Sequence, residues 1–192
     1  MKFNLENINL EIEHYKNFSN ELKNKIKQSG LLSIIDKSKI ESWTAVGTNK
    51  NLAYSSHGMM RFFGKFPPPI SRYLLTKFLK EKDVVLDPMG GSGTTAVESL
   101  LLDKYCHTYD LNPLMVLLQK VKITKIDINE IDKYKNWIIK KYKPKDYKVL
   151  NYIKPTLKNI DHWFLKETLE SLFGIRDLIE QIKPKKIKNF FL

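Results

Sequence analysis

The residues best suited to chemistry in this chain lie in one glycine-rich segment. It reads Asp87-Pro88-Met89-Gly90-Gly91-Ser92-Gly93-Thr94-Thr95. Because glycine has no Cβ, three glycines within four positions allow the backbone to turn sharply and to approach a ligand closely. A short apolar run precedes the segment, and apolar residues at helical spacing follow it. We therefore expect a strand, a loop and a helix whose free N–H groups near Thr94 favour a carboxylate or a phosphate.

Two common phosphate-binding motifs do not fit this segment. A Walker loop requires a lysine directly after its last glycine, whereas Gly93 is followed by Thr94. The segment is also no clean match to the dinucleotide motif G-x-G-x-x-G, because its spacing is G-G-x-G and an acid and a proline precede it. The pattern indicates a ligand site of another type.

Asp110 is the second residue with a clear chemical use. Residues 105–109 are typical of a second short strand, and Asp110 follows that strand directly. It stands roughly 20 positions after Asp87, the offset at which an acid in a doubly wound sheet accepts hydrogen bonds from ribose hydroxyls. Asp110 and the glycine segment together predict a nucleoside-containing ligand.

Two strand–helix units must position these residues. Pro113 is expected to begin a helix that runs through residue 121, because a proline in the first turn loses no helical hydrogen bond. With the strand, loop and helix of residues 83–102, this order favours an α/β protein with a parallel sheet of the doubly wound type. Another helix is expected over residues 70–80, after the rigid turn at residues 67–69.

The flanking segments are predicted to be mainly helical. Apolar residues at helical spacing predict a helical N-terminal appendage over residues 1–40. The remainder, residues 41–192, is expected to form the main domain. The apolar residues at helical spacing in the appendage are Tyr15, Phe18, Leu22 and Ile26, and Gly30 is expected to end their helix.

The C-terminal third is also expected to be helical from about residue 126, with breaks at Pro144 and Pro155. An amphipathic helix is expected over residues 161–182, closed by Pro184. Six apolar residues are predicted to line one side of it. They are Leu165, Leu169, Leu172, Phe173, Leu178 and Ile179.

Composition narrows the class of protein. The formal net charge of +12 suits a nucleic-acid partner. The codon bias of an AT-rich genome, which enriches Lys, Asn and Ile together, is the alternative explanation of this charge. The chain has neither a long apolar run nor a signal-peptide pattern, so we expect a soluble cytoplasmic protein. The single cysteine, Cys106, excludes an internal disulfide and a cysteine-built zinc site, and the histidines lack metal-ligand spacing. No metal is therefore expected.

The motifs resemble those of the amino-group DNA methyltransferases, which modify N6 of adenine or N4 of cytosine. The glycine segment is similar to the D-P-F-x-G-S-G-T-T cofactor motif of that family. Residues 109–113, Tyr-Asp-Leu-Asn-Pro, resemble the next motif, and residues 57–69 resemble the H…GKFxP segment. The similarity runs from about residue 50 to the C-terminus, with a small departure at Met89 and Gly90, where the family commonly has phenylalanine and a variable residue.

The resemblance implies a Rossmann-like (class I) methyltransferase fold with an incomplete parallel sheet and helices on both faces. It also implies S-adenosylmethionine as cofactor, double-stranded DNA as partner and a restriction-modification setting. Asp110 would hold the adenosine ribose, and residues 57–69 would pack against the methionine end. The implied cofactor-binding residues are His57, Lys65, Phe66, Pro67, Asp87, Pro88, Met89, Gly90, Gly91, Ser92, Gly93, Thr94, Thr95, Asp110, Leu111, Asn112 and Pro113.

One family motif is missing from the 192 residues. The chemistry of the family depends on a (Asp/Asn/Ser)-Pro-Pro-(Tyr/Phe/Trp) tetrapeptide, which binds the exocyclic amine and stacks on the flipped base. The only consecutive prolines here are Pro67-Pro68-Pro69, between Phe66 and Ile70. We therefore assign no catalytic residue and expect a second, complementary chain to carry the motif.

Two alternatives remain open at this point. The chain could be an inactive, truncated remnant that binds the cofactor without transferring a methyl group. It could also be a fragment of an RNA guanine-N2 methyltransferase, a group with a similar glycine loop, although residues 57–69 disfavour that reading. The target base and the DNA sequence that is recognised are not determined by these motifs.

Overall fold

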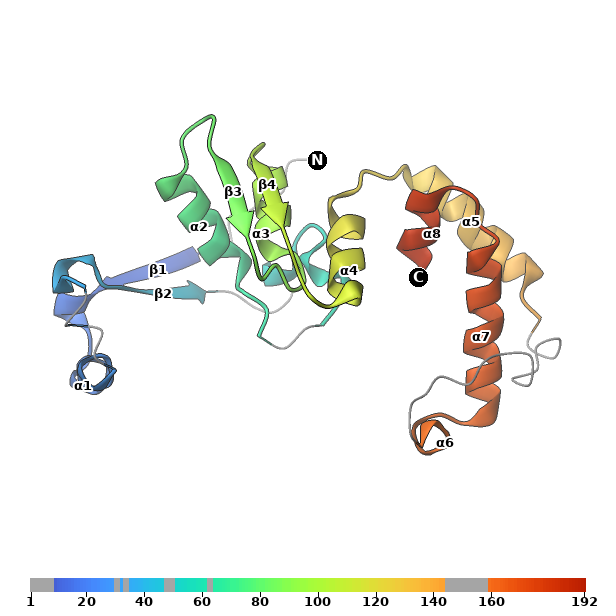
Figure 1. The fold of residues 1–192 in the computed structure, drawn as a ribbon, viewed down its shortest axis with the longest axis horizontal. Helices are drawn as coiled ribbons and strands as arrows, with labels where there is room; N and C mark the ends of the chain where they lie inside the picture. The colour runs from blue at the N-terminus through green and yellow to red at the C-terminus, as the bar shows by residue number, and fades with distance from the viewer. Residues whose placement is uncertain (1–8, 30–31, 33–34, 47–50, 62–63, 144–158) are drawn as a thin grey trace. The chain divides into compact units, whose positions relative to one another are not determined.

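The computed structural model describes residues 9–29, 32, 35–46, 51–61, 64–143 and 159–192 (Figure 1). The chain divides into two compact units, Met1–Ile123 and Thr124–Leu192. The first unit contains two small sheets and the glycine segment. The described part of the second unit consists of helices. The mixed α/β class expected from the sequence is confirmed, while a separate domain over residues 1–40 stays a prediction.

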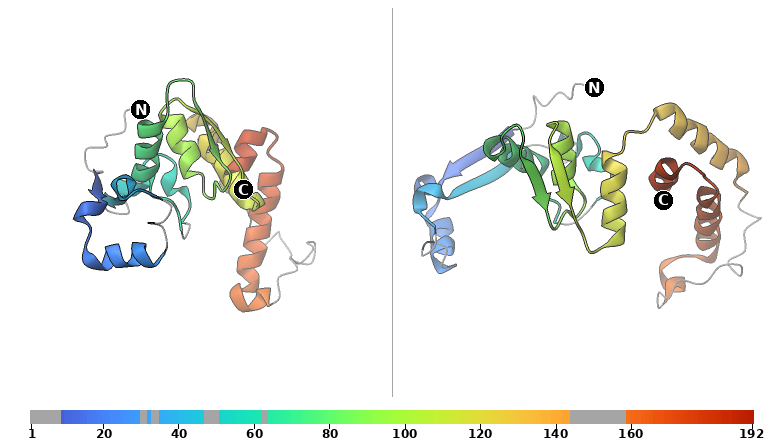
Figure 2. Two further views of the ribbon diagram at one scale, coloured as in Figure 1. Left: turned by 60° about the vertical axis from the view of Figure 1, so that its left-hand side comes forward. Right: turned by 45° about the horizontal axis from the view of Figure 1, so that its top comes forward.

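The glycine segment joins a strand to a helix, as predicted. Strand β3 spans Val84–Asp87, helix α3 spans Thr94–Leu101 and strand β4 spans Tyr105–Thr108. The strands pair in parallel, from Val84 opposite Tyr105 to Asp87 opposite Thr108, and lie side by side in all views (Figure 2). Helix α4, Pro113–Ile123, follows β4 and completes the second strand–helix unit.

Helix α3 forms the interior of the first unit. Ala96, Val97, Glu98 and Ser99 are buried, so an acid lies among apolar and small neighbours. Helix α2, Pro68–Phe78, packs against α3 and begins two residues before the expected start because Pro68 occupies the first helical turn. Two short 3-10 helices precede it, η4 at Asn51–Ala53 and η5 at His57–Met59.

The N-terminal segment is not wholly helical, and this corrects the sequence prediction. Residues Asn9–His14 form strand β1, which pairs antiparallel with strand β2, Glu41–Val46. The sequence Asn-Leu-Glu-Ile-Glu-His alternates polar and apolar residues, the period of a strand rather than a helix. The remaining elements are η1 at Tyr15–Asn17, helix α1 at Asn20–Gln28 and η3 at Lys37–Lys39.

One face of the β3–β4 sheet is exposed. Alternate side chains of the two strands, Val84, Leu86 and Tyr105, are 53%, 66% and 82% exposed. Val85, whose side chain points to the other face, is buried. Parallel sheets are normally covered on both faces, so this apolar surface departs from the expected arrangement of helices on both sides.

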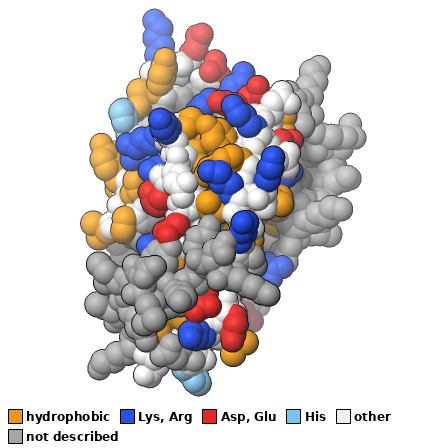
Figure 3. Space-filling model, turned by 90° about the vertical axis from the view of Figure 1, so that its right-hand side faces the viewer, with side chains coloured by type: hydrophobic (Ala, Val, Ile, Leu, Met, Phe, Trp, Pro, Cys, Tyr) orange, Lys and Arg blue, Asp and Glu red, His pale blue; other side chains and the backbone are white. Residues whose placement is uncertain are grey.

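The second unit contains helices α5, Ile128–Lys141; α6, Ile160–Trp163; α7, Lys166–Glu180; and α8, Lys185–Phe191. Its main core is built from five buried residues. They are Ile138, Leu178, Ile179, Ile182 and Ile187. Lysines and arginines surround an apolar patch, with acidic side chains between them (Figure 3). The basic charge is therefore dispersed on this face.

The long amphipathic helix expected over residues 161–182 is interrupted. Helix α6 ends at Trp163, and Leu165 precedes the first residue of α7. Leu165 and Leu172 are exposed, which corrects their assignment to the buried side, whereas Leu169 and Phe173 are buried as expected. Pro144, Pro155 and Gly30 lie outside the described residues. Among the residues that the structure describes, no helix combines the length and apolarity needed to cross a bilayer.

Candidate ligand-binding site

Glycine is required at two positions of the loop between β3 and α3. Gly93 has a φ of 81°, in the left-handed region that side chains disfavour, and it caps the start of α3. Gly90 has a different constraint, because a Cβ at this position would collide with Oγ1 of Thr108 and lie 2.8 Å from Nε2 of Gln119. The loop therefore lies directly against β4 and α4.

Hydrogen bonds from three later segments hold the loop in place. The Gly91 N–H donates to Oδ2 of Asp110 at 2.8 Å, and Nε2 of Gln119 donates to the Gly91 carbonyl at 2.9 Å. Thr108 fixes the Gln119 amide, since its hydroxyl donates to Oε1 at 3.1 Å. The Lys122 ammonium donates to the Ser92 carbonyl at 2.6 Å. The backbone of the loop is thus fixed before any ligand binds.

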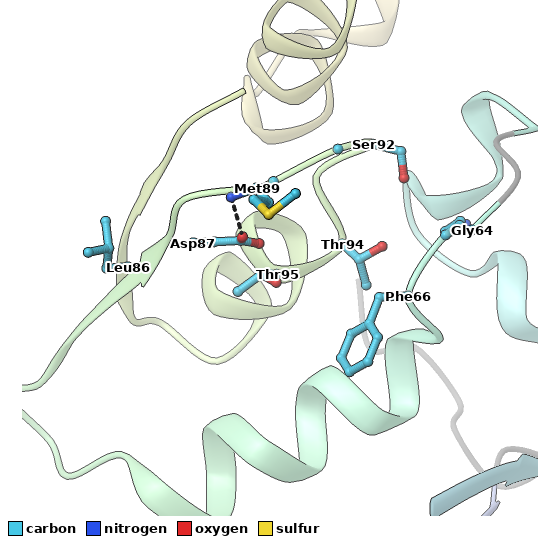
Figure 4. Close-up of a pocket in the computed structure, with 11 residues that line it drawn as sticks. Gly64, Phe66, Leu86, Asp87, Met89, Ser92, Thr94 and Thr95 are labelled. Atoms are coloured by element: carbon cyan, nitrogen blue, oxygen red, sulfur yellow. Dashed lines mark hydrogen bonds between the residues drawn. The ribbon is translucent and has the colours of Figure 1, made fainter. Parts of the chain in front are cut away.

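A cavity of about 430 Å³ lies on the loop, between the end of β3 and the start of α3 (Figure 4). The hydroxyls of Ser92 and Thr94 are buried within it and have no hydrogen-bond partner among the described residues. Buried hydroxyls normally have partners, so their position at a helix N-terminus favours a polar ligand. The lining residues are Gly64, Lys65, Phe66, Leu86, Asp87, Met89, Gly90, Gly91, Ser92, Thr94 and Thr95.

The structure thus brings two distant sequence segments to one cavity. Lys65 and Phe66, from the segment before α2, share the cavity wall with the glycine loop, and Figure 4 shows Phe66 of the one segment and Thr94 of the other. Of the expected cofactor residues, nine line the cavity. They are Lys65, Phe66, Asp87, Met89, Gly90, Gly91, Ser92, Thr94 and Thr95.

The other expected residues are not part of the wall of this cavity. Asp110 accepts the Gly91 N–H and, through Oδ1, the Asn112 N–H at 2.8 Å. It is partly exposed beside the loop. The remaining residues outside the wall are His57, Pro67, Pro88, Gly93, Leu111, Asn112 and Pro113. Their contact with a ligand stays a prediction.

His57 is fully buried and belongs to a polar network behind the loop. Its Nε2 lies 2.7 Å from Oε1 of Glu98, which also accepts the Tyr54 hydroxyl at 2.5 Å. Nε of Arg72 donates to the other Glu98 oxygen at 2.7 Å. Burial lowers the pKa of His57, although the Glu98 carboxylate acts in the opposite direction. The network joins the segment before α2, helix α2 and helix α3.

Several residues of this site were not found from the sequence. Glu98 lies in an otherwise apolar helical run, Ala-Val-Glu-Ser-Leu-Leu, and an acid on such a face is the one sequence signal that indicates a buried charge. Thr108, Gln119 and Lys122 have no distinguishing pattern, because their role depends on the way β4 and α4 pack against the loop.

Positive charge accumulates at one end of the site. Lys65 donates to the His57 carbonyl at 2.5 Å, and burial lowers the pKa of its ammonium group. Burial, with repulsion from Lys65, lowers the pKa of Lys122 to about 8. In the described residues no group of three or more His, Cys, Asp or Glu side chains could hold a metal ion. The two lysines favour a ligand with an anionic end.

A parallel strand–loop–helix unit with this glycine loop defines an α/β ligand-binding protein. Comparison with known families makes the class specific. A family model described as DNA methylase, whose name groups the N6 and N4 methyltransferases, matches residues 2–130, about two thirds of the chain. The chain belongs to this DNA methylase family, which confirms the amino-methyltransferase resemblance of its motifs.

Two curated proteins are similar to parts of the chain. The Type II methyltransferase M.MjaII of Methanocaldococcus jannaschii is 34% identical over 77 residues, which cover 40% of this chain and 14% of that protein. The Type II methyltransferase M.MvaI of Kocuria varians is 31% identical over 113 residues, 55% of this chain and 24% of that protein. The chain therefore spans less than a quarter of either relative. No solved structure shows a significant match.

Proposed function

We propose that this chain is the S-adenosylmethionine-binding half of a DNA methyltransferase with a Rossmann-like fold. The observation that carries the proposal is the cavity on the glycine loop, where the Ser92 and Thr94 hydroxyls are buried without partners at the start of α3. These groups fit the polar methionine end of the cofactor. Family membership supports the same donor. When bound, S-adenosylmethionine supplies the methyl group that is transferred to DNA.

Asp110 is suited to hold the ribose of this cofactor. Each of its carboxylate oxygens accepts one backbone N–H, from Gly91 and from Asn112, and each oxygen has further lone pairs for a hydroxyl donor. The two backbone bonds fix the carboxylate before a ligand arrives, which reduces the entropy cost of binding. Asp110 would thus orient the adenosine while the glycine loop holds the methionine end.

The acceptor in this proposal is an exocyclic amine of duplex DNA, N4 of cytosine or N6 of adenine. Such an amine is reached by flipping the base out of the helix, and the net charge of +12 favours binding to the DNA backbone. The family match to a DNA methylase favours DNA over the RNA guanine-N2 alternative. A restriction-modification role follows by similarity to the two Type II methyltransferases.

The base-binding tetrapeptide would come from a complementary chain. The sequence contains no (Asp/Asn/Ser)-Pro-Pro-aromatic motif, and the apolar face of β3–β4 is uncovered at Val84, Leu86 and Tyr105. Contiguous exposed apolar surface marks an interaction site. A second chain that extends or covers this sheet would bury the surface and bring its catalytic motif to the cavity.

Calorimetry and a methyl-transfer assay test the two parts of the proposal separately. The full chain should bind S-adenosylmethionine, and it should transfer no labelled methyl group to duplex DNA by itself. Transfer should appear when a chain carrying the tetrapeptide is added. An absence of cofactor binding would refute the donor assignment, whereas methylation by this chain alone would refute the division into two chains.

A further inference from the structure

Two lysines at the positively charged end of the site have no ion pair with a carboxylate of the described residues. Lys65 and Lys122 each donate to a backbone carbonyl, those of His57 and Ser92. In the described part of the chain neither ammonium group is within ion-pair distance of an Asp or Glu side chain. Lys122 is only 6% exposed. A buried charge without an opposite charge beside it is costly in free energy, so proteins rarely keep one unless a ligand or a specific role requires it.

The buried carboxylate behind the loop, that of Glu98, already has partners of its own. Both oxygens of Glu98 are used, by His57 and Tyr54 on one side and by Arg72 on the other. Of the titratable groups around Lys122, Lys65 lowers its pKa by repulsion, and Lys122 in turn lowers the pKa of His57. The charges behind the loop therefore sum to a net positive region even with Glu98 ionised.

This positive region lies at the cavity. Lys65 and Ser92 are both in the cavity wall, and the Ser92 carbonyl is the group that Lys122 holds. The unpartnered Ser92 and Thr94 hydroxyls and the N-terminus of α3 lie at the same place. All of these features favour a negatively charged ligand group. The glycine loop with the start of α3, the segment before α2 and helix α4 supply them.

We infer that Lys122 is a positioning residue that makes the cavity selective for a ligand with a carboxylate. It fixes the Ser92 carbonyl and adds its charge to that of Lys65. The inference rests on the proposed function, in which the carboxylate is that of the methionine part of S-adenosylmethionine.

The same arrangement links binding to pH. With its pKa lowered to about 8, the Lys122 ammonium loses its proton as the pH rises through that value. A bound carboxylate favours the protonated form and raises this pKa, so binding takes up a proton near and above pH 8. The preference for a carboxylate should therefore weaken between about pH 7 and about pH 9.

Calorimetry with three probes tests the inference on the full chain. The probes are S-adenosylmethionine, decarboxylated S-adenosylmethionine and 5′-methylthioadenosine, which lacks the amino-acid portion. The wild-type protein should prefer the first probe over the second by about tenfold at pH 7, the ratio that corresponds to one modest charge interaction. Lys122→Met should lose most of that preference and weaken the binding of 5′-methylthioadenosine, which has no carboxylate, much less than that of S-adenosylmethionine. Lys122→Arg should restore it.

Lys82→Met is the matched control, since Lys82 is exposed in the turn between α2 and β3 and its loss should change none of the affinities. Proton uptake, measured in buffers of different ionisation enthalpy, should fall in Lys122→Met relative to wild type. The amino group of the ligand titrates with both proteins and cancels in this difference. A structural role alone would not move this difference.

The outcomes distinguish the role of Lys122 from the presence of the donor site. Equal weakening of all three probes by Lys122→Met, or equal wild-type affinity for the first two probes, would overturn the inference while leaving the donor site intact. Failure of every adenosine compound to bind the wild-type protein would overturn the proposed function itself. If Lys122→Met does not fold, the wild-type preference measured at pH 7 and at pH 9 still decides, because an unchanged ratio contradicts the role of Lys122.

Discussion

The inner and outer faces of the β3–β4 sheet differ in how completely their groups are used. On the inner face, Glu98 of α3 is fully buried and accepts three hydrogen bonds, while Gln119 and Lys122 of α4 hold the glycine loop. On the outer face, Val84, Leu86 and Tyr105 are exposed. The inner side carries the candidate ligand site, and the outer side exposes the apolar residues that a second layer normally covers in a parallel sheet.

Loss of the Glu98 carboxylate should have the largest effect. Glu98→Ala leaves Arg72 and His57 without their shared anion in a buried position, and we expect the free energy of unfolding to fall by about 3–5 kcal/mol. Urea denaturation followed by circular dichroism measures this change. The exposed Glu81, changed to alanine, is the control and should shift stability by no more than about 0.5 kcal/mol. Similar losses for both variants would contradict the network.

Gly90→Ala should have the next largest effect. The added Cβ collides with the Thr108 hydroxyl, so the loop must shift, and we expect a loss of about 1–3 kcal/mol in stability, with weaker cofactor binding. The double variant Gly90→Ala/Thr108→Ala removes the colliding oxygen and should recover part of both losses. No recovery in the double variant would show that the close approach to β4 is not the cause.

Asp110→Ala should act on binding more than on folding. Removing the carboxylate takes away the proposed ribose acceptor and the partner of the Gly91 N–H, so affinity for S-adenosylmethionine should fall by about 1–3 kcal/mol in calorimetry. Glu81→Ala again serves as the acid-to-alanine control. Equal affinity of the Asp110 variant and the wild-type protein would remove Asp110 from the ribose site.

The outer face should give the smallest effect on the isolated chain. Val84 is 53% exposed and lies outside the cavity wall, so Val84→Glu should change the free energy of unfolding by no more than about 0.5 kcal/mol. Its proposed effect appears only with the complementary chain, when methyl transfer should drop because a charge would be buried at the interface. Full transfer activity in the reconstituted pair would move the interface away from this face.

The sequence predicted the elements that carry the loop more accurately than the side chains that support it. The parallel strands, α3 near Thr94 and α4 from Pro113 follow from local patterns of glycine, proline and apolar residues. Gln119 and Lys122 were not identified, because their hydrogen bonds to the loop depend on packing between elements far apart in the sequence. His57 was predicted from a motif as a cofactor residue, and only the structure shows its ring directed to Glu98.

In the N-terminal segment the secondary structure itself was predicted incorrectly. Helical spacing of Tyr15, Phe18 and Leu22 predicted one helix, yet the alternation in residues 9–14 produces a strand once β2 is available as a partner. A strand depends on a partner outside its own segment, whereas a helix satisfies its backbone locally. Short amphipathic segments before a possible partner strand are therefore difficult to assign from sequence alone.

The two-stranded form of the β3–β4 sheet has a practical consequence for the protein in solution. Within the described residues each strand has one neighbour, so the backbone N–H and C=O groups along both outer edges can template another strand. Together with the uncovered apolar face, these edges make the colloidal behaviour of the chain depend on its concentration. The apparent molecular mass measured by light scattering should increase with concentration for this chain alone. Co-expression with a chain that covers the sheet should raise its soluble yield.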